Sequence, residues 1–365
     1  MIRMNDFQAE PKELFQRQMQ AVERVLRGGR FILGSEVAKF ESAWANACGA
    51  RYAVGVGSGL DALEIGMRAL GIGAGDEVVT TSLTAFATVL AVMRAGATPV
   101  LADIDPQTGL MDPDSVERCL SSRTKAVLLV HLYGRMREMD RWQDLCRSAR
   151  VLILEDCAQA HLASWNGRAA GRHGEWGAYS FYPTKNLGAL GDAGALVTDD
   201  ESVAQRARIL RNYGQAERYH HVEPGLNSRL DEIQAALLSV RLGYLQDFTE
   251  RRRGIARLYH ASIRNPAVTL LQSSPDDSNH VHHLFDLLCN ERNRLIRHLE
   301  EHDILALSHY PVPIHRQPPC REARRDPQGL RRAEHFADRC LSIPCHPHMS
   351  ESDVQRVAEA INAFR

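Results

Sequence analysis

The stretch AYSFYPTKNLGALGDAGALVT, residues 178–198, decides how the rest of the chain is interpreted. It opens with one strand-like run, AYSFY (178–182), and closes with another, GALVT (194–198). Lys185 lies in the loop between them, among apolar, aromatic and glycine residues. Desolvation in such a place would lower the pKa of the amine and free it for chemistry. The alternative is an ordinary loop lysine.

The rarity of lysine draws attention to the same position. Of 44 basic residues in a chain of 365, only four are lysine: Lys12, Lys39, Lys125 and Lys185. A guanidinium stays protonated, with a pKa above about 12, so arginine cannot supply a neutral amine. Three of these lysines fall in helical or pre-strand positions where arginine would serve, which leaves Lys185.

Strand-like and helical patterns alternate from about residue 36 to residue 200. Besides the two runs above, the strand-like segments are YAVGV (52–56), EVVTT (77–81), TPVLADI (98–104), KAVLLVHLY (125–133) and VLILED (151–156). Several are apolar on both faces, and helical stretches at 59–70, 113–121 and 137–149 lie between them. This order predicts an α/β fold with a mainly parallel, buried sheet between helices. Ligands then bind beyond the carboxyl ends of the strands.

The two ends of the chain have different patterns. Residues 11–27 place Leu14, Phe15, Met19, Val22, Val25 and Leu26 at the spacing of one helical face. After about residue 245 the pattern weakens: RRRG (251–254) is expected on a solvated helix face and 273–278 in a turn. A strand over 281–289 and helices over 292–302 and 351–364 follow. We therefore expect an N-terminal helical segment (1–28), a large domain (29–245) and a small α+β domain (246–365).

Composition excludes several classes of protein. Hydrophobic residues make up 44% and charged residues 24%, and 45 acidic residues balance the 44 basic ones. No nucleic-acid or membrane partner is therefore expected. The chain has no apolar run of about 18 residues and no apolar signal region at its start. Its eight scattered cysteines are typical of reduced thiols in the cytoplasm, and its histidines lack metal-site spacing.

Two further motifs follow strand-like runs. GVGSGLDAL (55–63) is a small-residue turn before a helix, where backbone N–H groups and the helix N-terminus favour an anion. A turn without a ligand is an equally good interpretation of this motif alone. LEDCAQAH (154–161) places Asp156 at a strand end, where a carboxylate could keep a heteroaromatic nitrogen protonated. A helix cap or a surface acid is the alternative.

Two later loops add polar and aromatic groups. PGLNSRLDEIQAALL (224–238) presents Asn227 and Arg229 at a helix start, and SHYPVPIHRQPP (308–319) is a proline-stiffened loop with two histidines and a tyrosine. A lysine, a carboxylate and an anion cradle are the three parts that pyridoxal 5′-phosphate needs. Lys185, Asp156 and the turn at 55–63 supply them, so the sequence predicts this cofactor.

With these motifs in this order, the sequence resembles the DegT-type nucleotide-sugar aminotransferases, a branch of the aspartate aminotransferase fold (fold type I). The resemblance covers nearly the whole chain. It is carried by RFILGSEVAKFE (30–41), YAVGVGSGLDAL (52–63), VLADIDP (100–106), VHLYG (130–134), EDCAQAH (155–161), SFYPTKNLGALGD (180–192), LRNYG (210–214), NSRLDEIQAAL (227–237), HLF (283–285) and HYPVPIHRQP (309–318).

The resemblance assigns roles at the matching positions. Lys185 would form the Schiff base and carry the proton, Asp156 would pair with the pyridine nitrogen, and Gln159 would lie beside the ring. The phosphate would be held at Ser58, Gly59 and Leu60, by Ser180, and by Asn227 of a second subunit, which implies a homodimer with shared active sites. The substrate-site residues would be Tyr182, Tyr219, Arg229, His309 and Tyr310.

Two positions depart from the family pattern. Leu60 stands where the family commonly has threonine, which removes a phosphate contact. In TAFAT (84–88) the family has an aromatic residue at the position of Ala85, and that aromatic stacks on the pyridine ring. Either Phe86 shifts over the ring, or the ring has Ala85 as a smaller neighbour. We favour Ala85, because the flanking residues hold the register.

The resemblance implies transamination from an amino acid, L-glutamate, to a nucleotide-linked keto-sugar, at C3 of a 3-keto-6-deoxyhexose. Amination at C4 of a 4-keto sugar is one alternative, and a non-catalytic cofactor-binding regulator is another. A dehydratase of the same family would have histidine in place of Lys185. A dinucleotide-binding oxidoreductase would need a GxGxxG motif after the first strand, and this sequence has none there.

Overall fold

A twisted sheet forms the centre of the computed structural model, which describes residues 1–272 and 277–365. Its strand order is β1-β9-β8-β5-β4-β2-β3-β14. The strands are β1 (Tyr52–Val56), β2 (Glu77–Thr81), β3 (Thr98–Ala102), β4 (Thr124–Val130), β5 (Leu152–Asp156), β8 (Trp176–Ser180), β9 (Gly194–Thr198) and β14 (Arg324–Arg325). Only β9 runs antiparallel to its neighbours in this sheet. The predicted α/β fold with a mainly parallel sheet is confirmed.

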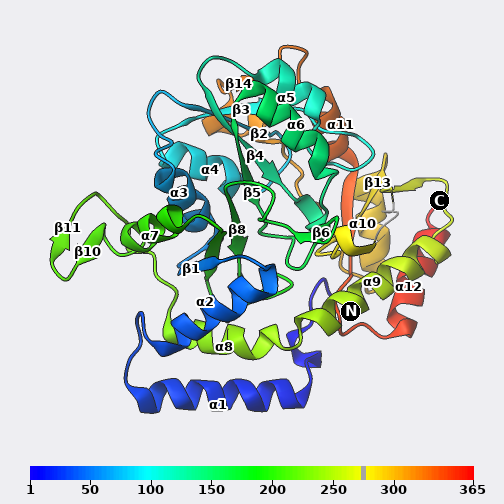
Figure 1. Cartoon of the computed structure of the whole chain (residues 1–365). Helices are drawn as coiled ribbons and strands as arrows, with labels where there is room; N and C mark the ends of the chain where they lie inside the picture. The colour runs from blue at the N-terminus through cyan, green and yellow to red at the C-terminus, as the bar shows by residue number, and fades with distance from the viewer. Residues whose placement is uncertain (273–276) are drawn as a thin grey trace.

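Helices cover both faces of this sheet (Figure 1). One face packs against α3 (Gly59–Ala69), α4 (Phe86–Arg94) and α7 (Glu201–Leu210), and the other against α2 (Ser35–Cys48), α5 (Pro113–Cys119) and α6 (Met139–Ala149). Along β4, Ala126 and Leu128 join the first core and Val127 and Leu129 the second. The sheet is buried on both sides, which is why its strands are continuously apolar.

The remaining helices lead into a second, smaller part of the molecule. α1 (Lys12–Gly28) packs along α8 (Glu232–Leu242), and α9 (Leu245–Ser262) follows. A three-stranded antiparallel sheet is formed by β12 (Val268–Leu270), β13 (Phe285–Cys289) and β15 (Cys340–Ile343). It packs with α10 (Arg292–Glu301) and α12 (Glu351–Ala363) around a core of its own. The boundary at residue 245 stays a prediction, and the turn expected at 273–278 lies mostly outside the described residues.

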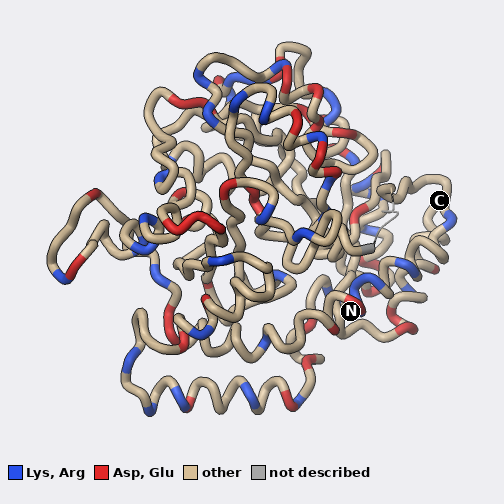
Figure 2. Tube along the Cα trace, viewed as in Figure 1, with Lys and Arg blue, Asp and Glu red and all other residues tan. Residues whose placement is uncertain are grey.

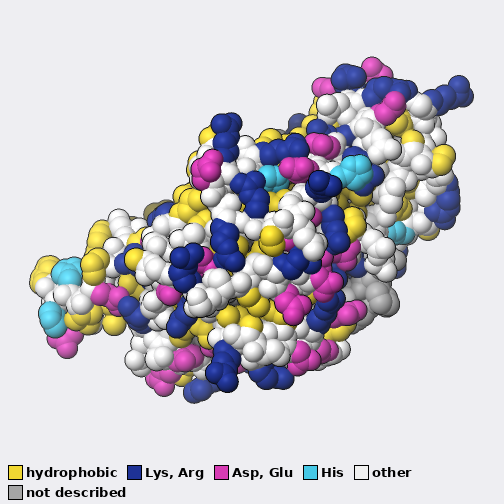
Figure 3. All heavy atoms as spheres, turned by 90° about the horizontal axis from the view of Figure 1, so that it is seen from above, with side chains coloured by type: hydrophobic (Ala, Val, Ile, Leu, Met, Phe, Trp, Pro, Cys, Tyr) yellow, Lys and Arg dark blue, Asp and Glu magenta, His cyan; other side chains and the backbone are white. Residues whose placement is uncertain are grey.

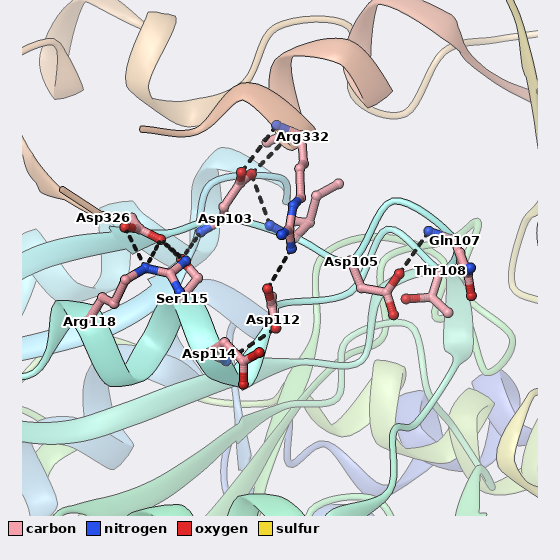
Figure 4. Close-up of polar contacts among 12 residues, drawn as sticks. Asp103, Asp105, Gln107, Thr108, Asp112, Asp114, Ser115, Arg118, Asp326 and Arg332 are labelled. Carbon is pink, nitrogen blue, oxygen red and sulfur yellow. Dashed lines mark hydrogen bonds and ion pairs between the residues drawn. The ribbon is translucent and has the colours of Figure 1, made fainter. Parts of the chain in front are cut away.

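One C-terminal segment crosses back to the large sheet. β14 pairs with β3, and α11 (Arg331–Arg339) follows it. Figure 4 shows the polar contacts that hold this segment: Asp326 accepts hydrogen bonds from Ser115 and Arg118, and Asp103 accepts from the backbone N–H of Arg332. The partition at residue 245 therefore does not describe the segment around β14. This docking fixes the far end of the HYPVP loop (309–313) on the large sheet.

One surface expectation is wrong. The run RRRG is not a solvated face, because Arg252 and Arg253 are buried and donate to backbone carbonyls of the 278–283 segment and Cys345. On α1, Leu14 and Val25 are buried, but Phe15, Met19 and Leu26 remain exposed. Half of the apolar stripe of α1 is thus uncovered in the single chain.

Charge is spread evenly over the molecule. Basic and acidic residues alternate along the trace, and on the face seen from above neither sign dominates (Figures 2 and 3). No helix among the described residues is long and apolar enough to cross a membrane.

Candidate active site

A cavity of about 100 Å³ lies beyond the carboxyl ends of β1, β2, β4, β5 and β8. The residues that line it are Gly59, Leu60, Leu63, Thr84, Ala85, Ala87, Thr88, Val130, His131, Asp156, Ala158, Gln159, Ser180 and Lys185. Segments far apart in sequence therefore meet at the edge where a parallel sheet binds ligands.

Lys185 supplies the amine of this cavity. It follows β8, and its backbone N–H donates to the carbonyl oxygen of Tyr182 at 2.8 Å. Burial lowers the pKa of Lys185 to about 8, although the nearby Asp156 carboxylate opposes this shift. The other three lysines are exposed on the surface. A lysine amine with this pKa is neutral in a substantial fraction of molecules near neutral pH, and so it is nucleophilic.

Asp156 ends β5 on the opposite side of the cavity from α3. Its Oδ2 accepts a hydrogen bond from the Thr88 hydroxyl at 2.8 Å, and its Oδ1 accepts from the backbone N–H of Ala158 at 3.1 Å. Burial raises the pKa of Asp156 above its ordinary value, and these two hydrogen bonds limit the rise. The carboxyl group is thus desolvated but still prepared to bind a positively charged group.

Thr88 is a site residue that the sequence interpretation missed. Its side chain is fully buried at the first turn of α4, where it also contacts the Thr84 hydroxyl at 2.9 Å. The motif TAFAT (84–88) drew attention only to its aromatic position. The signal available in the sequence was a threonine shortly after a buried strand, where a side chain can face the ligand cavity.

A second buried acid supports the cavity from behind. Glu155 accepts hydrogen bonds from the His131 ring at 2.8 Å and from the backbone N–H groups of Gly171, His173 and Gly174. Burial acts to raise the pKa of Glu155, but these donors outweigh it and hold the pKa below its ordinary value. Glu155 is therefore an ionised anchor for His131, whereas Asp156 faces the cavity.

The N-terminus of α3 forms the predicted anion cradle. The Ser58 hydroxyl accepts from the backbone N–H of Asp61 at 3.1 Å and caps the helix. A Cβ placed on Gly59 would lie 2.6 Å from the Cβ of Ser180, so only glycine fits there. Gly59, Leu60 and Ser180 line the same cavity. Backbone N–H groups at a helix start favour a phosphate in this position.

The HYPVP loop reaches the cavity through Gln159. The Gln159 side chain accepts from the backbone N–H of Tyr133 at 2.6 Å and donates to the Tyr310 hydroxyl at 3.2 Å. The Tyr133 hydroxyl donates to the carbonyl oxygen of His309 at 2.5 Å. Tyr133, from the VHLYG motif, is a second residue that the sequence interpretation missed, and it links that motif to His309 and Tyr310.

Of the two candidate ring neighbours, Ala85 lines the cavity and Phe86 does not. Phe86 instead packs against an apolar cluster with Val89, Leu101 and Ile314. The inclusion of Phe86 among the cofactor contacts is therefore corrected, because the start of α4 turns its side chain into that cluster. The smaller neighbour, Ala85, occupies the position that the register predicted.

Eight predicted site residues do not line this cavity: Ser58, Phe86, Tyr182, Tyr219, Asn227, Arg229, His309 and Tyr310. Tyr182, Tyr219 and Asn227 are exposed, and Tyr219 belongs to the hairpin β10 (Gln215–Glu217) and β11 (His220–His221), which projects from the body (Figure 1). Arg229 donates to Asn212 at 3.1 Å and stacks on Tyr213. Within one chain these residues do not contribute to the cavity that holds Lys185.

The residues of the cavity fit pyridoxal phosphate on three independent features. A neutralisable amine, a buried carboxyl group and a helix N-terminus that excludes any Cβ all face one space. The first suits an aldehyde, the second a protonated ring nitrogen and the third a phosphate.

Comparison with known proteins agrees with this chemistry. The sequence model of the DegT/DnrJ/EryC1/StrS aminotransferase family matches residues 12–362 of the chain. A dTDP-3-amino-3,6-dideoxy-alpha-D-galactopyranose transaminase of Aneurinibacillus thermoaerophilus is 44% identical over 94% of each chain. The crystal structure of Streptomyces venezuelae DesV in complex with a ketimine intermediate superposes with a TM-score of 0.95, at 42% identity over 99% of this chain and 97% of that one.

A Bacillus subtilis structure, NtdA with the bound cofactor PMP, matches with a TM-score of 0.89 at 28% identity, over 97% of this chain and 82% of that one. PMP is the amino form of pyridoxal phosphate. The chain therefore belongs to the DegT/DnrJ/EryC1/StrS aminotransferase family and is a pyridoxal-phosphate-dependent enzyme.

Proposed function

We propose that the chain transfers an amino group from L-glutamate to C3 of a nucleotide-linked 3-keto-6-deoxyhexose. The observation that carries the aminotransferase chemistry is the pair Lys185 and Asp156 in one cavity, with the pKa of the amine lowered and that of the carboxyl group raised. The similarity to a 3-amino-sugar transaminase supports C3 over C4.

The cofactor would be held by residues at three strand ends, those of β1, β5 and β8. Asp156 would pair with its ring nitrogen, Gly59, Leu60 and Ser180 would hold the phosphate, and Lys185 would bind the aldehyde carbon. When bound, pyridoxal phosphate withdraws electrons from the carbon that carries the transferred amine. Thr88 keeps Asp156 oriented as an acceptor, with the 2.8 Å hydrogen bond described above.

Lys185 would move the proton in both halves of the reaction. Its amine could accept a proton from Cα of the amino acid when neutral and donate it again when protonated, and a pKa of about 8 gives both forms near neutral pH. His309 and Tyr310 lie at the side of the cavity reached by Gln159, where the keto-sugar would enter. These two residues are the proposed contacts to the nucleotide sugar.

A homodimer completes the site in this proposal. Phe31, Ile32 and Leu190 are exposed apolar side chains on segments bonded to the start of α8, along which the half-uncovered α1 packs. A contiguous exposed apolar patch marks an interface. Asn227, Arg229 and Tyr219 of a partner subunit would then reach the phosphate and the sugar.

A two-stage assay tests the function. Purified enzyme is first mixed with L-glutamate alone, and the absorption of the cofactor bound at Lys185 should shift to that of the amino form. A screen of nucleotide 3-keto and 4-keto sugars follows, with product NMR to locate the amine. An amine at C4 would overturn the regiochemistry, and absence of any spectral change with amino acids would favour a non-catalytic regulator.

A further inference from the structure

A buried hydrogen-bonded chain connects the small sheet to the HYPVP loop. Asp286 on β13 and Ser342 on β15 are directly paired across the two strands. The Ser342 hydroxyl lies 2.5 Å from Oδ1 of Asp286 and 2.8 Å from Nδ1 of His309. Asp286 is 5% exposed and Ser342 is fully buried, so water does not compete for these contacts.

The backbone fixes His309 in this position. Leu307 and Ser342 exchange two hydrogen bonds, at 3.1 and 2.6 Å, which join the start of the HYPVP loop to β15. The Tyr133 hydroxyl holds the carbonyl oxygen of His309 from the other side. These backbone contacts place His309 where its imidazole reaches the Ser342 hydroxyl.

The surroundings of Asp286 favour its neutral form. Its second oxygen, Oδ2, is buried and has no hydrogen-bond partner among the described residues. Asp286 lines one cavity together with Arg135, His260, His280 and His282, and none of the ion pairs found among the described residues joins Asp286 to any of them. An ionised carboxylate without partners is costly in such a place, so burial raises the pKa of Asp286 well above its ordinary value.

Counting hydrogens along the chain fixes the tautomer of the imidazole. A neutral Asp286 donates its proton to the Ser342 oxygen, and the single serine hydrogen is then available for Nδ1 of His309. Nδ1 accepts, so the hydrogen of the neutral ring sits on Nε2. An ionised Asp286 would reverse every bond and leave Nε2 as an acceptor. Nε2 makes no hydrogen bond to the described residues.

We propose that Asp286 is a positioning residue which, through Ser342, makes His309 present an N–H donor on Nε2 to an acceptor oxygen of the nucleotide-sugar substrate. The inference rests on the proposed function, in which His309 contacts that substrate, and the charge of Lys185 acts on His309, so the ring lies near the cofactor site. A ring with its lone pair on Nε2 could not donate to such an oxygen. Asp286 itself touches neither substrate nor cofactor.

Three variants of the cofactor-loaded enzyme test the hydrogen-bonded chain from Asp286 through Ser342 to His309. Asp286→Asn retains a donor toward Ser342, whereas Asp286→Leu and Ser342→Ala remove the connection. We expect Asp286→Asn to keep the KM for the nucleotide sugar within about threefold, and the other two to raise it about tenfold or more. The rate of the half-reaction with L-glutamate should stay nearly unchanged in all three.

¹⁵N NMR of the His309 ring gives a readout that does not depend on substrate. The wild-type enzyme and Asp286→Asn should show hydrogen on Nε2, and Ser342→Ala should lose this preference. Hydrogen on Nδ1 in the wild type, or equal KM values for Asp286→Asn and Asp286→Leu, would overturn the proposal. If the wild type aminates no nucleotide sugar, the proposed function fails, while the NMR result still decides the role of Asp286.

Discussion

The Thr88 hydroxyl offers the sharpest test of how the cofactor is held. Replacing Thr88 by Val keeps the volume and the apolar contacts of a fully buried side chain. It removes the 2.8 Å hydrogen bond to Asp156 and the 2.9 Å contact with Thr84. The pKa of Asp156, which burial already raises, would rise further because this hydrogen bond is one of the contacts that lower it.

The expected loss follows from the charge on Asp156. A hydrogen bond to a charged group contributes about 1.5–3 kcal/mol, which corresponds to roughly 10- to 150-fold in affinity. The carboxylate must be ionised to pair with a protonated ring nitrogen, so this loss falls mainly on cofactor binding. The cofactor-free protein can protonate Asp156 instead, and its unfolding free energy should change by less.

Equilibrium titration of cofactor-free enzyme with pyridoxal phosphate measures the effect, with urea unfolding of the cofactor-free protein as the companion measurement. Thr88→Ser is the matched control, because it keeps the hydroxyl and loses one methyl group. The reasoning is refuted if Thr88→Val and Thr88→Ser bind the cofactor equally well. It is also refuted if Thr88→Val lowers the free energy of unfolding and the free energy of cofactor binding by the same amount.

Three other substitutions give separate tests. Gly59→Ala should cost about 1–3 kcal/mol in cofactor binding or stability, since its Cβ would lie 2.6 Å from that of Ser180; Gly254→Ala, with only a flexible side chain 3.9 Å away, is the control for thermal unfolding. Lys185→Met should stabilise the cofactor-free protein at pH 7 by on the order of 2 kcal/mol, because the folded state holds the pKa of Lys185 at about 8. The wild type binds fewer protons folded than unfolded between pH 8 and about 10.4, so urea unfolding should show this gap closing as pH rises. Asp326→Asn should destabilise the docked β14 segment by about 1–3 kcal/mol at pH 7. Burial acts to raise the pKa of Asp326, but Arg118 and Ser115 hold it below its ordinary value. The wild-type advantage should therefore begin to fall below about pH 4 in acid unfolding and disappear only below the lowered pKa of the folded state.

Local pattern was sufficient for the elements of the large domain. The runs at 52–56, 77–81 and 194–198 are β1, β2 and β9 with the same bounds. Apolar periodicity is a property of neighbouring residues, so it can be read without knowing the fold. It also identified the N-terminal helix, α1, although it did not separate the side chains buried in the single chain from the exposed ones, because both follow the same period.

The sequence by itself determined the reactive pair and the class of cofactor. A lone lysine beyond a strand, an aspartate ending another and a small-residue turn keep their chemical meaning wherever the fold places them. Only the tertiary structure decided which partners tune them, because those partners come from distant segments. Thr88 meets Asp156 across 68 positions, and Asp286 meets Ser342 across 56. Such contacts depend on strand order and register. A local sequence pattern, however strong, does not encode either of them.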